Sequence, residues 1–272
     1  MPSDSFRKLR EVLLSLRRGT IAVSGGVDSM TLSSFAHSVL GRKHVRMVHA
    51  LSPAVPTAAT ARVRKLATRE GWQLTEVDAG EFYDPRYRAN PVNRCFFCKS
   101  NLYETLDELA EGIVMSGTNR DDLDDYRPGL QAAANNGVRH PYVEASMTKA
   151  DVRHLARELG LDDLAELPAS PCLSSRVETG ISIEPEQLSL IEEIETWLQA
   201  TFAPRTVRCR IRNTGMVIEL DPETLNRLSD KDRHTVIDGA TARMTGTGYL
   251  KVSFAAYVRG SAFVGTGLTP AA

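Results

Sequence analysis

The chain has 272 residues, of which 42% are hydrophobic and 25% charged, and its formal net charge is −1. This composition is ordinary for a globular protein, and a chain of this length can bury a core without disulfide bonds. The balanced charge gives no bulk attraction to nucleic acid, and no apolar run approaches the roughly 20 residues of a membrane helix. We therefore expect a cytoplasmic protein with neither nucleic acid nor membrane as a partner.

The first half of the chain alternates between short apolar strands and helical segments. Residues 1–18 mix leucine with charged side chains and have no signal-peptide core, which predicts an amphipathic helix. The expected strands are 20–24, 44–51, 74–77 and 113–116, and the expected helices are 27–40, 56–71 and 152–159. Strands that alternate with helices indicate βαβ units, so we predict an α/β fold with an open parallel sheet and helices on both faces.

The pattern changes near residue 180, where we place a boundary between a first domain, 1–180, and a small C-terminal α/β domain, 181–272. After a helix around 188–198, residues 205–212 alternate strictly, which is typical of a half-buried strand. Its apolar face carries Val207, Cys209 and Ile211, and its other face carries Arg208, Arg210 and Arg212. Further strands are expected at 217–220 and 249–254.

A hexapeptide, Ser-Gly-Gly-Val-Asp-Ser, stands between the first strand and the first long helix. Gly25 and Gly26 allow backbone amides to approach a phosphate, and the positive end of the following helix points to the same place. Ser24 and Ser29 add hydroxyl donors. Asp28 would repel a phosphate unless a cation lay between them, so it predicts Mg²⁺. The alternative is a glycine turn that merely starts a helix, but the position after the first strand favours a nucleotide site.

A second loop follows the strand at 113–116. In an open parallel sheet, ligands bind beyond the carboxyl ends of the strands, at the point where the strand order reverses. We therefore expect Gly117 and Thr118 to flank the same crevice as the hexapeptide. A solvated turn is the alternative interpretation of the acidic run 121–125.

The four cysteines are unevenly placed, and in a reducing compartment they indicate metal binding or catalysis more than disulfides. Cys95 and Cys98 form a C-x-x-C pair. Cys172 follows a proline and precedes Arg176, a cation that can lower a thiol pKa and so favour the reactive thiolate. Cys209 shares the apolar face of its strand, which predicts core packing.

Three cysteines remain, and three thiolates can hold a [4Fe–4S] cluster that keeps one iron open. A zinc site completed by a histidine, a cysteine that itself donates sulfur without a metal, and an inert thiol are the other interpretations of these residues.

The hexapeptide at 24–29 resembles the PP-loop of the ATP-pyrophosphatases, which are adenine nucleotide alpha hydrolase-like enzymes that adenylate a substrate carbonyl. It is followed in order by NRCFFCK at 93–99, SGTNRDDLDDYRPGL at 116–130 and LPASPCLSSR at 167–176. This series resembles the LarE family of ATP-dependent sulfur transferases, which help to make the nickel-pincer nucleotide of lactate racemase. AYVRGS at 256–261 is similar to the family's GYRxGS element, with Ala256 and an extra valine as departures.

The resemblance implies that a carboxylate of pyridinium-3,5-biscarboxylic acid mononucleotide is adenylated with MgATP and is then converted to a thiocarboxylate. In one branch of the family the cysteine that corresponds to Cys172 gives up its own sulfur. In the other branch Cys95, Cys98 and Cys172 hold a [4Fe–4S] cluster that carries an extra sulfide. Because this chain has all three cysteines, we favour the cluster branch.

The resemblance also implies roles for individual residues and for the C-terminal domain. Catalysis would involve Cys172, Asp28 as the Mg²⁺ ligand, Lys99 and Arg176. Contacts to the substrate nucleotide would come from Ser175, Glu195, Arg208 and Arg210, so the C-terminal domain would contribute to substrate binding. Family members also assemble as homo-oligomers, and we expect that domain to take part in the assembly.

Two further classes of function compete with this interpretation. One is another PP-loop enzyme, either a tRNA thiolase or an amide-forming synthetase, neither of which accounts for both the neutral charge and Cys172. The other is a nucleotide-binding module without turnover.

Overall fold

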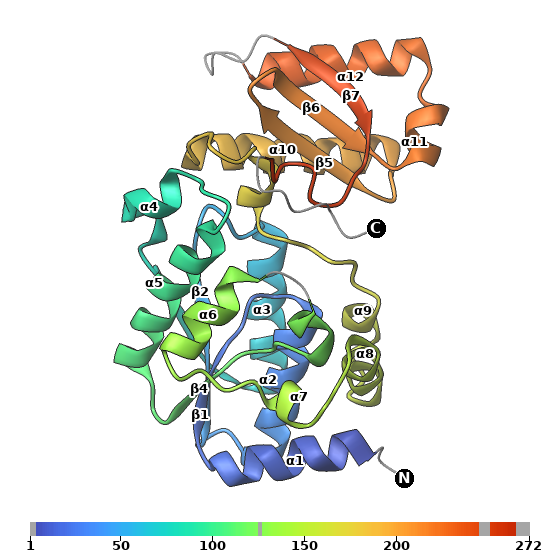
Figure 1. Ribbon diagram of the computed structural model, residues 1–272. Coiled ribbons are helices and arrows are strands. Elements are labelled where there is room, and N and C mark those ends of the chain that lie inside the picture. Colours follow the sequence, from blue (N-terminus) through green and yellow to red (C-terminus); the bar gives the residue numbers. More distant parts are fainter. Residues whose placement is uncertain (1–3, 125–126, 245–250, 265–272) are drawn as a thin grey trace. The chain divides into compact units, whose positions relative to one another are not determined.

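The computed structural model describes residues 4–124, 127–244 and 251–264, which form two compact units (Figure 1). The first unit comprises Met1–Glu81 and Cys95–Ser170, and the second comprises Phe82–Arg94 and Pro171–Ala272. The expected boundary near residue 180 differs from this division, which falls after Ser170. The joining of Phe82–Arg94 to the second unit was not expected either, because no local pattern in the sequence indicates it.

The first unit contains a four-stranded parallel sheet, which confirms the predicted fold class. Its strands are β1 (Gly19–Ala22), β2 (Val45–Ala50), β3 (Gln73–Val77) and β4 (Ile113–Met115), in the order β3-β2-β1-β4. The chain runs outward from β1 to β3 and then returns to the other side of β1. The strand order therefore reverses between β1 and β4, where open α/β sheets bind ligands.

Helices cover both faces of this sheet, as predicted. The helices are α1 (Asp4–Leu16), α2 (Val27–Leu40), α3 (Thr57–Glu70), α5 (Arg94–Leu109), α6 (Pro128–Asn135), α7 (Pro141–Glu144), α8 (Lys149–Glu158) and α9 (Asp162–Ala165). Met47 of β2 packs in one core with α1, α2, α3 and α8, and the next residue, Val48, packs in a second core with α5 and α6. Successive strand residues point to opposite faces, which produces the two cores.

The second unit is a small α/β structure around a mixed sheet. Strands β5 (Val207–Arg212) and β6 (Gly215–Leu220) are antiparallel, and β7 (Val252–Ala256) runs parallel to β6. Its other elements are η1 (Glu81–Tyr83, whose first residue belongs to the first unit), α4 (Pro85–Arg88), η3 (Leu173–Arg176), α10 (Pro185–Phe202), α11 (Pro222–Arg227) and α12 (Asp230–Arg243). The strand expected at 249–254 begins later, and residues 249–250 lie outside the described residues.

Cys209 lies on the β5 face that packs against the core and is completely buried. Burial, followed by the nearby charge of Glu195, raises the pKa of this thiol well above its usual value. Cys209 is therefore a neutral core thiol, as the alternation of its strand predicted. No helix within the described ranges is long and apolar enough to span a bilayer.

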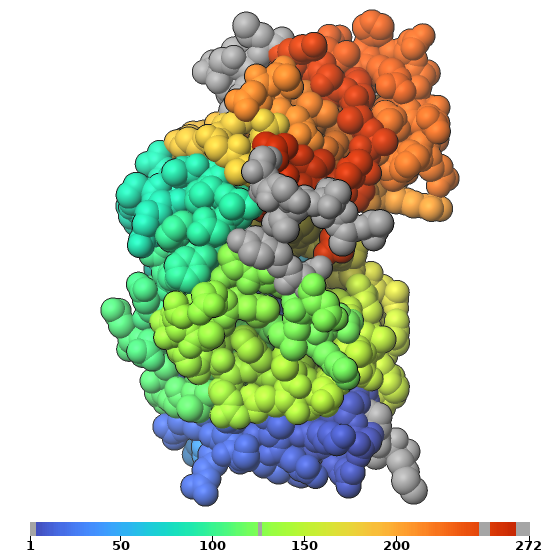
Figure 2. Space-filling model, in the orientation of Figure 1, coloured from blue at the N-terminus to red at the C-terminus, as the bar shows by residue number. Residues whose placement is uncertain are grey.

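Helix α1 is amphipathic, as predicted, and forms the blue surface of the first unit in Figure 2. Phe6, Leu9 and Leu13 point into the core that α1 shares with α2, whereas Leu14 is 43% exposed. The helix therefore contributes to stability through one stripe of side chains.

Leu13→Ala should lower the free energy of unfolding by about 2–5 kcal/mol, because it removes a fully buried side chain and leaves a cavity. The adjacent Leu14→Ala is the matched control and should change that free energy by less than about 0.5 kcal/mol. Urea unfolding of both variants measures the difference. Equal effects would show that α1 does not dock by the face described.

Candidate functional site

The phosphate-loop hexapeptide forms a tight turn between β1 and α2. Gly25 has a φ of 80°, and a Cβ on it would lie 2.6 Å from the carbonyl oxygen of Ala59. Only glycine tolerates both the left-handed backbone and this close approach. The loop is therefore pressed against the first turn of α3, where Arg62 Nε donates a hydrogen bond of 2.9 Å to the Gly25 carbonyl.

The two serines of the hexapeptide fasten the loop to the start of α2. Ser29 Oγ accepts a hydrogen bond from the Ser24 amide at 3.0 Å, and the two hydroxyl oxygens lie 3.0 Å apart. Gly26 is the N-cap of α2, and the helix has no side-chain cap among the described residues. The first amides of a helix are donors without intrahelical partners, so this end of α2 can receive a phosphate.

The loop after β4 lies directly against the start of α2. A Cβ on Gly117 would be 2.7 Å from the Ser29 amide nitrogen and 2.9 Å from the Asp28 carbonyl carbon. Gly117 and Thr118 are thus neighbours of the hexapeptide, as their place at the strand-order reversal predicted.

The Asp28 side chain bonds to two partners, Asn119 in the loop after β4 and Lys149 at the start of α8. Asn119 Nδ2 donates to Oδ1 at 3.2 Å, and the Lys149 ammonium forms an ion pair with Oδ2. Tyr142 hydroxyl donates to the Asp28 carbonyl at 3.1 Å. Burial, followed by the charge of Asp28, raises the pKa of Tyr142 well above its usual value, so the phenol keeps its proton. The Asp28 carboxylate remains 26% exposed and can accept a cation.

Sequence reasoning missed three polar residues near this loop. Lys149 is the first residue of α8, after the N-cap Thr148, and it lies before the helix expected at 152–159. His49 is buried and bridges the Val23 carbonyl at 2.8 Å and Thr60 Oγ1 at 2.9 Å, which fixes the end of β1. His140 Nδ1 lies 2.8 Å from Ser116 Oγ, and burial lowers the pKa of His140.

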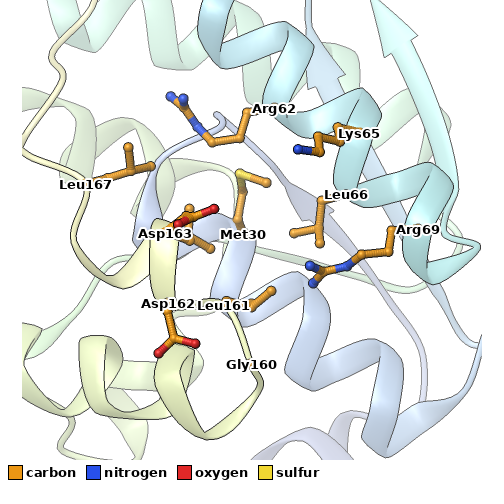
Figure 3. A pocket seen from close by; sticks show the side chains of 11 residues that line it. Met30, Arg62, Lys65, Leu66, Arg69, Gly160, Leu161, Asp162, Asp163 and Leu167 are labelled. Atoms are coloured by element: carbon orange, nitrogen blue, oxygen red, sulfur yellow. The ribbon is translucent and has the colours of Figure 1, made fainter.

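A cavity of about 390 Å³ lies between α3 and the α8–α9 turn. Figure 3 shows its lining, with the basic side chains of α3 opposite two aspartates of α9. The lining residues are Met30, Arg62, Lys65, Leu66, Arg69, Gly160, Leu161, Asp162, Asp163, Leu164 and Leu167. The cavity borders the phosphate loop through Arg62, which bonds to Gly25.

Cys95 and Cys98 lie in the first unit, in the first turn of α5. Their spacing of three residues places both thiols on one face of the helix. Both are half-buried, and none of the four cysteines, all of them described, is in a disulfide. Lys99 extends along the same helix, with its ammonium 5.8 Å from the centre of the Tyr103 ring.

Cys172 lies in the second unit and is exposed at the start of η3. Arg176 Nη1 donates to the carbonyl oxygens of Pro171 and Cys172, at 2.7 and 3.2 Å, and to Ser175 Oγ at 3.1 Å. The Cys172 thiol is therefore exposed, while the carbonyl groups of Pro171 and Cys172 are hydrogen-bonded to the Arg176 guanidinium.

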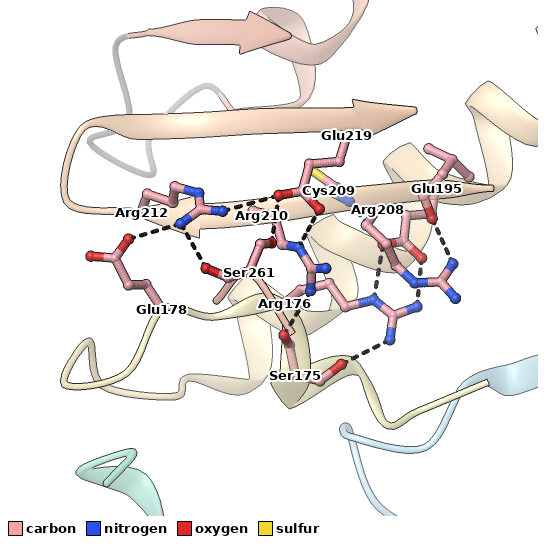
Figure 4. A network of polar contacts seen from close by, with 11 residues as sticks. Ser175, Arg176, Glu178, Glu195, Arg208, Cys209, Arg210, Arg212, Glu219 and Ser261 are labelled. Atoms are coloured by element: carbon pink, nitrogen blue, oxygen red, sulfur yellow. Dashed lines mark hydrogen bonds and ion pairs between the residues drawn. The ribbon is translucent and has the colours of Figure 1, made fainter. Parts of the chain in front are cut away.

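Arg176 is itself part of a buried ion pair, shown in Figure 4. It is 3% exposed and binds both carboxylate oxygens of Glu195, at 3.0 and 2.9 Å. Glu195 also accepts the Cys209 amide at 2.8 Å. Burial opposes the charge of Arg176, but the hydrogen bond and charge of Glu195 raise the pKa of Arg176 above its usual value. Glu195 is thus not a solvated charge.

A second buried pair lies beside the first. Arg210 Nε donates to Glu219 at 2.9 Å, and Arg210 Nη1 donates to the Ser175 carbonyl at 2.9 Å. Arg210 is only 3% exposed, so it is not a solvated charge, and its expected contact with the substrate nucleotide stays a prediction. Arg208 is half-buried, and burial together with the positive charge of Arg176 lowers the pKa of Arg208.

The residues expected at the site are therefore divided between the two units. The hexapeptide, the loop after β4, Lys99 and the Cys95/Cys98 pair belong to the first unit, and Cys172, Ser175, Arg176, Glu195, Arg208 and Arg210 belong to the second. Within the described part of the chain, no three His, Cys, Asp or Glu side chains group as metal ligands. The iron–sulfur ligand set stays a prediction.

Known proteins resemble the chain over most of its length, although no protein-family model matches it. An uncharacterized protein of Synechocystis sp. is 38% identical over 84% of this chain and 85% of its own length. The B subunit of a glutamine-hydrolysing GMP synthase of Methanopyrus kandleri is 27% identical over 65% of this chain and 61% of its own length.

A third relative identifies the family. The pyridinium-3,5-bisthiocarboxylic acid mononucleotide synthase of Lactiplantibacillus plantarum is 32% identical over 212 residues, which are 76% of this chain and 76% of that protein. That synthase is a LarE protein, and the likeness covers three quarters of both chains. This chain therefore belongs to the LarE family of PP-loop sulfur transferases.

Proposed function

We propose that the chain is an ATP-dependent sulfur transferase that converts a carboxylate of pyridinium-3,5-biscarboxylic acid mononucleotide into a thiocarboxylate. The observation that carries the proposal is a glycine loop beneath the uncapped start of α2, in the same chain as the exposed Cys172. The kinship to the L. plantarum synthase supports the choice of substrate, because that protein is named for the bisthiocarboxylic product.

In the first step, the amides at the start of α2 and the hydroxyls of Ser24, Ser29 and Thr118 hold the triphosphate of ATP. A substrate carboxylate oxygen attacks the α-phosphorus, pyrophosphate leaves, and an acyl-adenylate forms. Asp28 would hold Mg²⁺, since its partly exposed carboxylate is a hard oxygen ligand beside the loop. Bound there, the ion would neutralise phosphate charge, and the Lys149 ammonium adds a second positive charge.

In the second step, a sulfur nucleophile attacks the acyl carbon, AMP leaves, and a thiocarboxylate remains. If Cys172 is the donor, its Sγ forms a thioester, and loss of the α-proton with cleavage of the Cβ–Sγ bond leaves dehydroalanine. An amide-forming enzyme or a nucleotide-binding module would have no use for this thiol.

The three cysteines of the predicted cluster offer suitable donors, because none is in a disulfide and two share one face of α5. Cys95, Cys98 and Cys172 would hold the [4Fe–4S] group, which supplies a sulfide when it is present. We favour this source of sulfur, because a sacrificial cysteine alone leaves the Cys95/Cys98 pair unexplained.

The substrate phosphate is proposed to meet Arg208. Burial and the positive charge of Arg176 lower the pKa of Arg208. A bound anion would offset both effects, because it stabilises the charged guanidinium. Four further residues would line the substrate site next to Arg208, since their polar groups bond to one another: Ser175, Arg176, Glu195 and Arg210. We also propose that the chain assembles as a homo-oligomer, as the family resemblance implies.

Asp28→Asn should lower the rate of pyrophosphate release by at least about 100-fold, because the neutral amide cannot hold Mg²⁺ against the phosphates. The measurement is pyrophosphate release from MgATP with the pyridinium dicarboxylate nucleotide present. Asp107→Asn, which neutralises an exposed aspartate of α5, is the control and should leave the rate unchanged. Full turnover in Asp28→Asn would refute the Mg²⁺ assignment. A wild-type chain without substrate-dependent release would be only a nucleotide-binding module.

Cys172→Ser should release pyrophosphate at nearly the wild-type rate but form no thiocarboxylate, because adenylation precedes the sulfur step. Cys209→Ser is the matched control, and it should retain sulfur transfer because Cys209 is a buried core thiol. Mass spectrometry of the nucleotide product distinguishes the two results. Thiolated product from Cys172→Ser would count against the assigned role.

Protein purified without oxygen should contain iron and acid-labile sulfide, and Cys95→Ser should lose both, because three thiolates are needed to hold the cluster. Metal and sulfide analysis, with the mass of Cys172 after one turnover, decides between the two sulfur sources. A colourless, fully active protein in which Cys172 has become dehydroalanine would establish the sacrificial route instead.

A further inference from the structure

We propose that the segment Phe82–Arg94 positions Cys172, and that Tyr87 and Asn90 are its two positioning residues. The inference rests on the proposed function, since it concerns the loop that carries the reactive thiol. The segment follows β3 and precedes α5 in the chain, but it belongs to the second unit. Its side-chain hydrogen bonds reach residues 174–184, which lie 87 to 96 positions later in the chain.

The contact closest to Cys172 is made by Tyr87. Its hydroxyl lies 2.6 Å from Ser174 Oγ, and Tyr87 and Ser174 are 2% and 0% exposed. Ser174 is the second residue of η3 and stands two positions after Cys172. Two buried hydroxyls satisfy each other here, so the loss of one leaves the other without this partner in the protein interior.

Asn90 fixes the chain on the far side of η3. Its Nδ2 group donates to the carbonyl oxygens of Val177, Glu178 and Ile181 at 3.3, 2.9 and 2.9 Å. The main-chain carbonyl oxygen of Asn90 accepts a hydrogen bond from the Gly180 amide at 3.0 Å. Asn90 is fully buried in a left-handed conformation with a φ of 51°, which asparagine adopts more readily than most residues.

The other end of the Asn90 amide connects to the residue before Cys95. Arg94 Nη1 donates to Asn90 Oδ1 at 2.9 Å, and the Arg94 guanidinium lies 4.4 Å from the centre of the Phe263 ring. Arg94 is 1% exposed. Aspartate at position 90 could not replace this amide, because it has no donor for the three carbonyl oxygens.

These bonds act on a loop whose thiol is exposed while its main chain is hydrogen-bonded on both sides of the thiol. Arg176 holds the carbonyls of Pro171 and Cys172, and Tyr87 holds η3 through Ser174. Whether Cys172 gives up its own sulfur or helps to hold the cluster that supplies a sulfide, the sulfur must meet a bulky acyl-adenylate. A fixed backbone at Cys172 raises the rate of that step, because less ordering is needed in the transition state. The segment would therefore affect the sulfur step and not adenylation.

The test compares Tyr87→Phe with Tyr83→Phe, which removes the same hydroxyl from a tyrosine of the same segment that is 83% exposed. The first readout is hydrogen exchange at the amides of Ser175 and Val177, which bond to the carbonyls of Cys172 and Ser174 at 3.0 and 3.2 Å. The second readout is the amount of thiocarboxylate formed per pyrophosphate released.

Tyr87→Phe should speed exchange at these two amides about tenfold and lower the yield of thiocarboxylate per pyrophosphate at least about threefold. Its rate of pyrophosphate release should stay at the wild-type value, and Tyr83→Phe should match the wild type in every measurement. Ser174→Ala should reproduce the effects of Tyr87→Phe. The double variant should be no worse than either single variant, because all three lose the same bond.

Two results would overturn the inference. In one, Tyr87→Phe behaves like Tyr83→Phe. In the other, exchange accelerates but the yield per pyrophosphate does not fall, so that the segment only stabilises the fold. The wild-type yield in the same assay tests the proposed function separately, since a wild-type chain that forms no thiocarboxylate refutes sulfur transfer whatever the variants do.

Discussion

The proposed nucleotide site depends on one constraint, which is the backbone contact between the loop after β4 and the first turn of α2. Gly117 can lie against Ser29 only because it has no side chain, and Gly25 can lie against Ala59 for the same reason. These contacts bring the loop after β4, the start of α2 and the first turn of α3 together. Asn119 before η2 and Lys149 of α8 both bond to Asp28 of α2 there.

A different kind of interaction organises the second unit. Arg176 and Arg210 are buried, and each is paired with a glutamate whose side chain is at most 12% exposed. Such pairs contribute little net stability when they are complete, but the loss of one partner costs about 3–5 kcal/mol, because a charge is then left buried alone. These pairs fix the geometry of the loop, since Arg176 also bonds to the Cys172 carbonyl and Arg210 to the Ser175 carbonyl.

Local signals in the sequence predicted the elements well where the signal lay within one turn or one strand. The amphipathic pattern of α1, the alternating strands and helices of the first half and the alternation of β5 all correspond to observed structure. The parallel sheet followed from the order of these elements. The hexapeptide was placed correctly between β1 and α2 because its glycines have a backbone role that side-chain packing cannot change.

Properties that depend on distant partners could not be predicted in the same way. The alternation of β5 placed Arg210 opposite Cys209, but it could not show that Glu219 of the neighbouring strand would bury it. Lys149 looked like an ordinary helix residue, since its partner Asp28 is more than a hundred positions away. The Phe82–Arg94 segment has no apolar periodicity that would predict where it packs. Tyr87 and Asn90 attach it to the second unit through hydrogen bonds instead.

The division of the chain also bears on how such a protein can be cut or recombined. The polypeptide passes between the units at Glu81/Phe82, at Arg94/Cys95 and at Ser170/Pro171. A fragment that ends at Ser170 would keep Tyr87 and Asn90 but would lose Ser174, which bonds to the Tyr87 hydroxyl, and the three carbonyl oxygens that accept from Asn90 Nδ2. Neither unit is therefore a portable module, and a gene fusion at a single junction could not transfer either one intact.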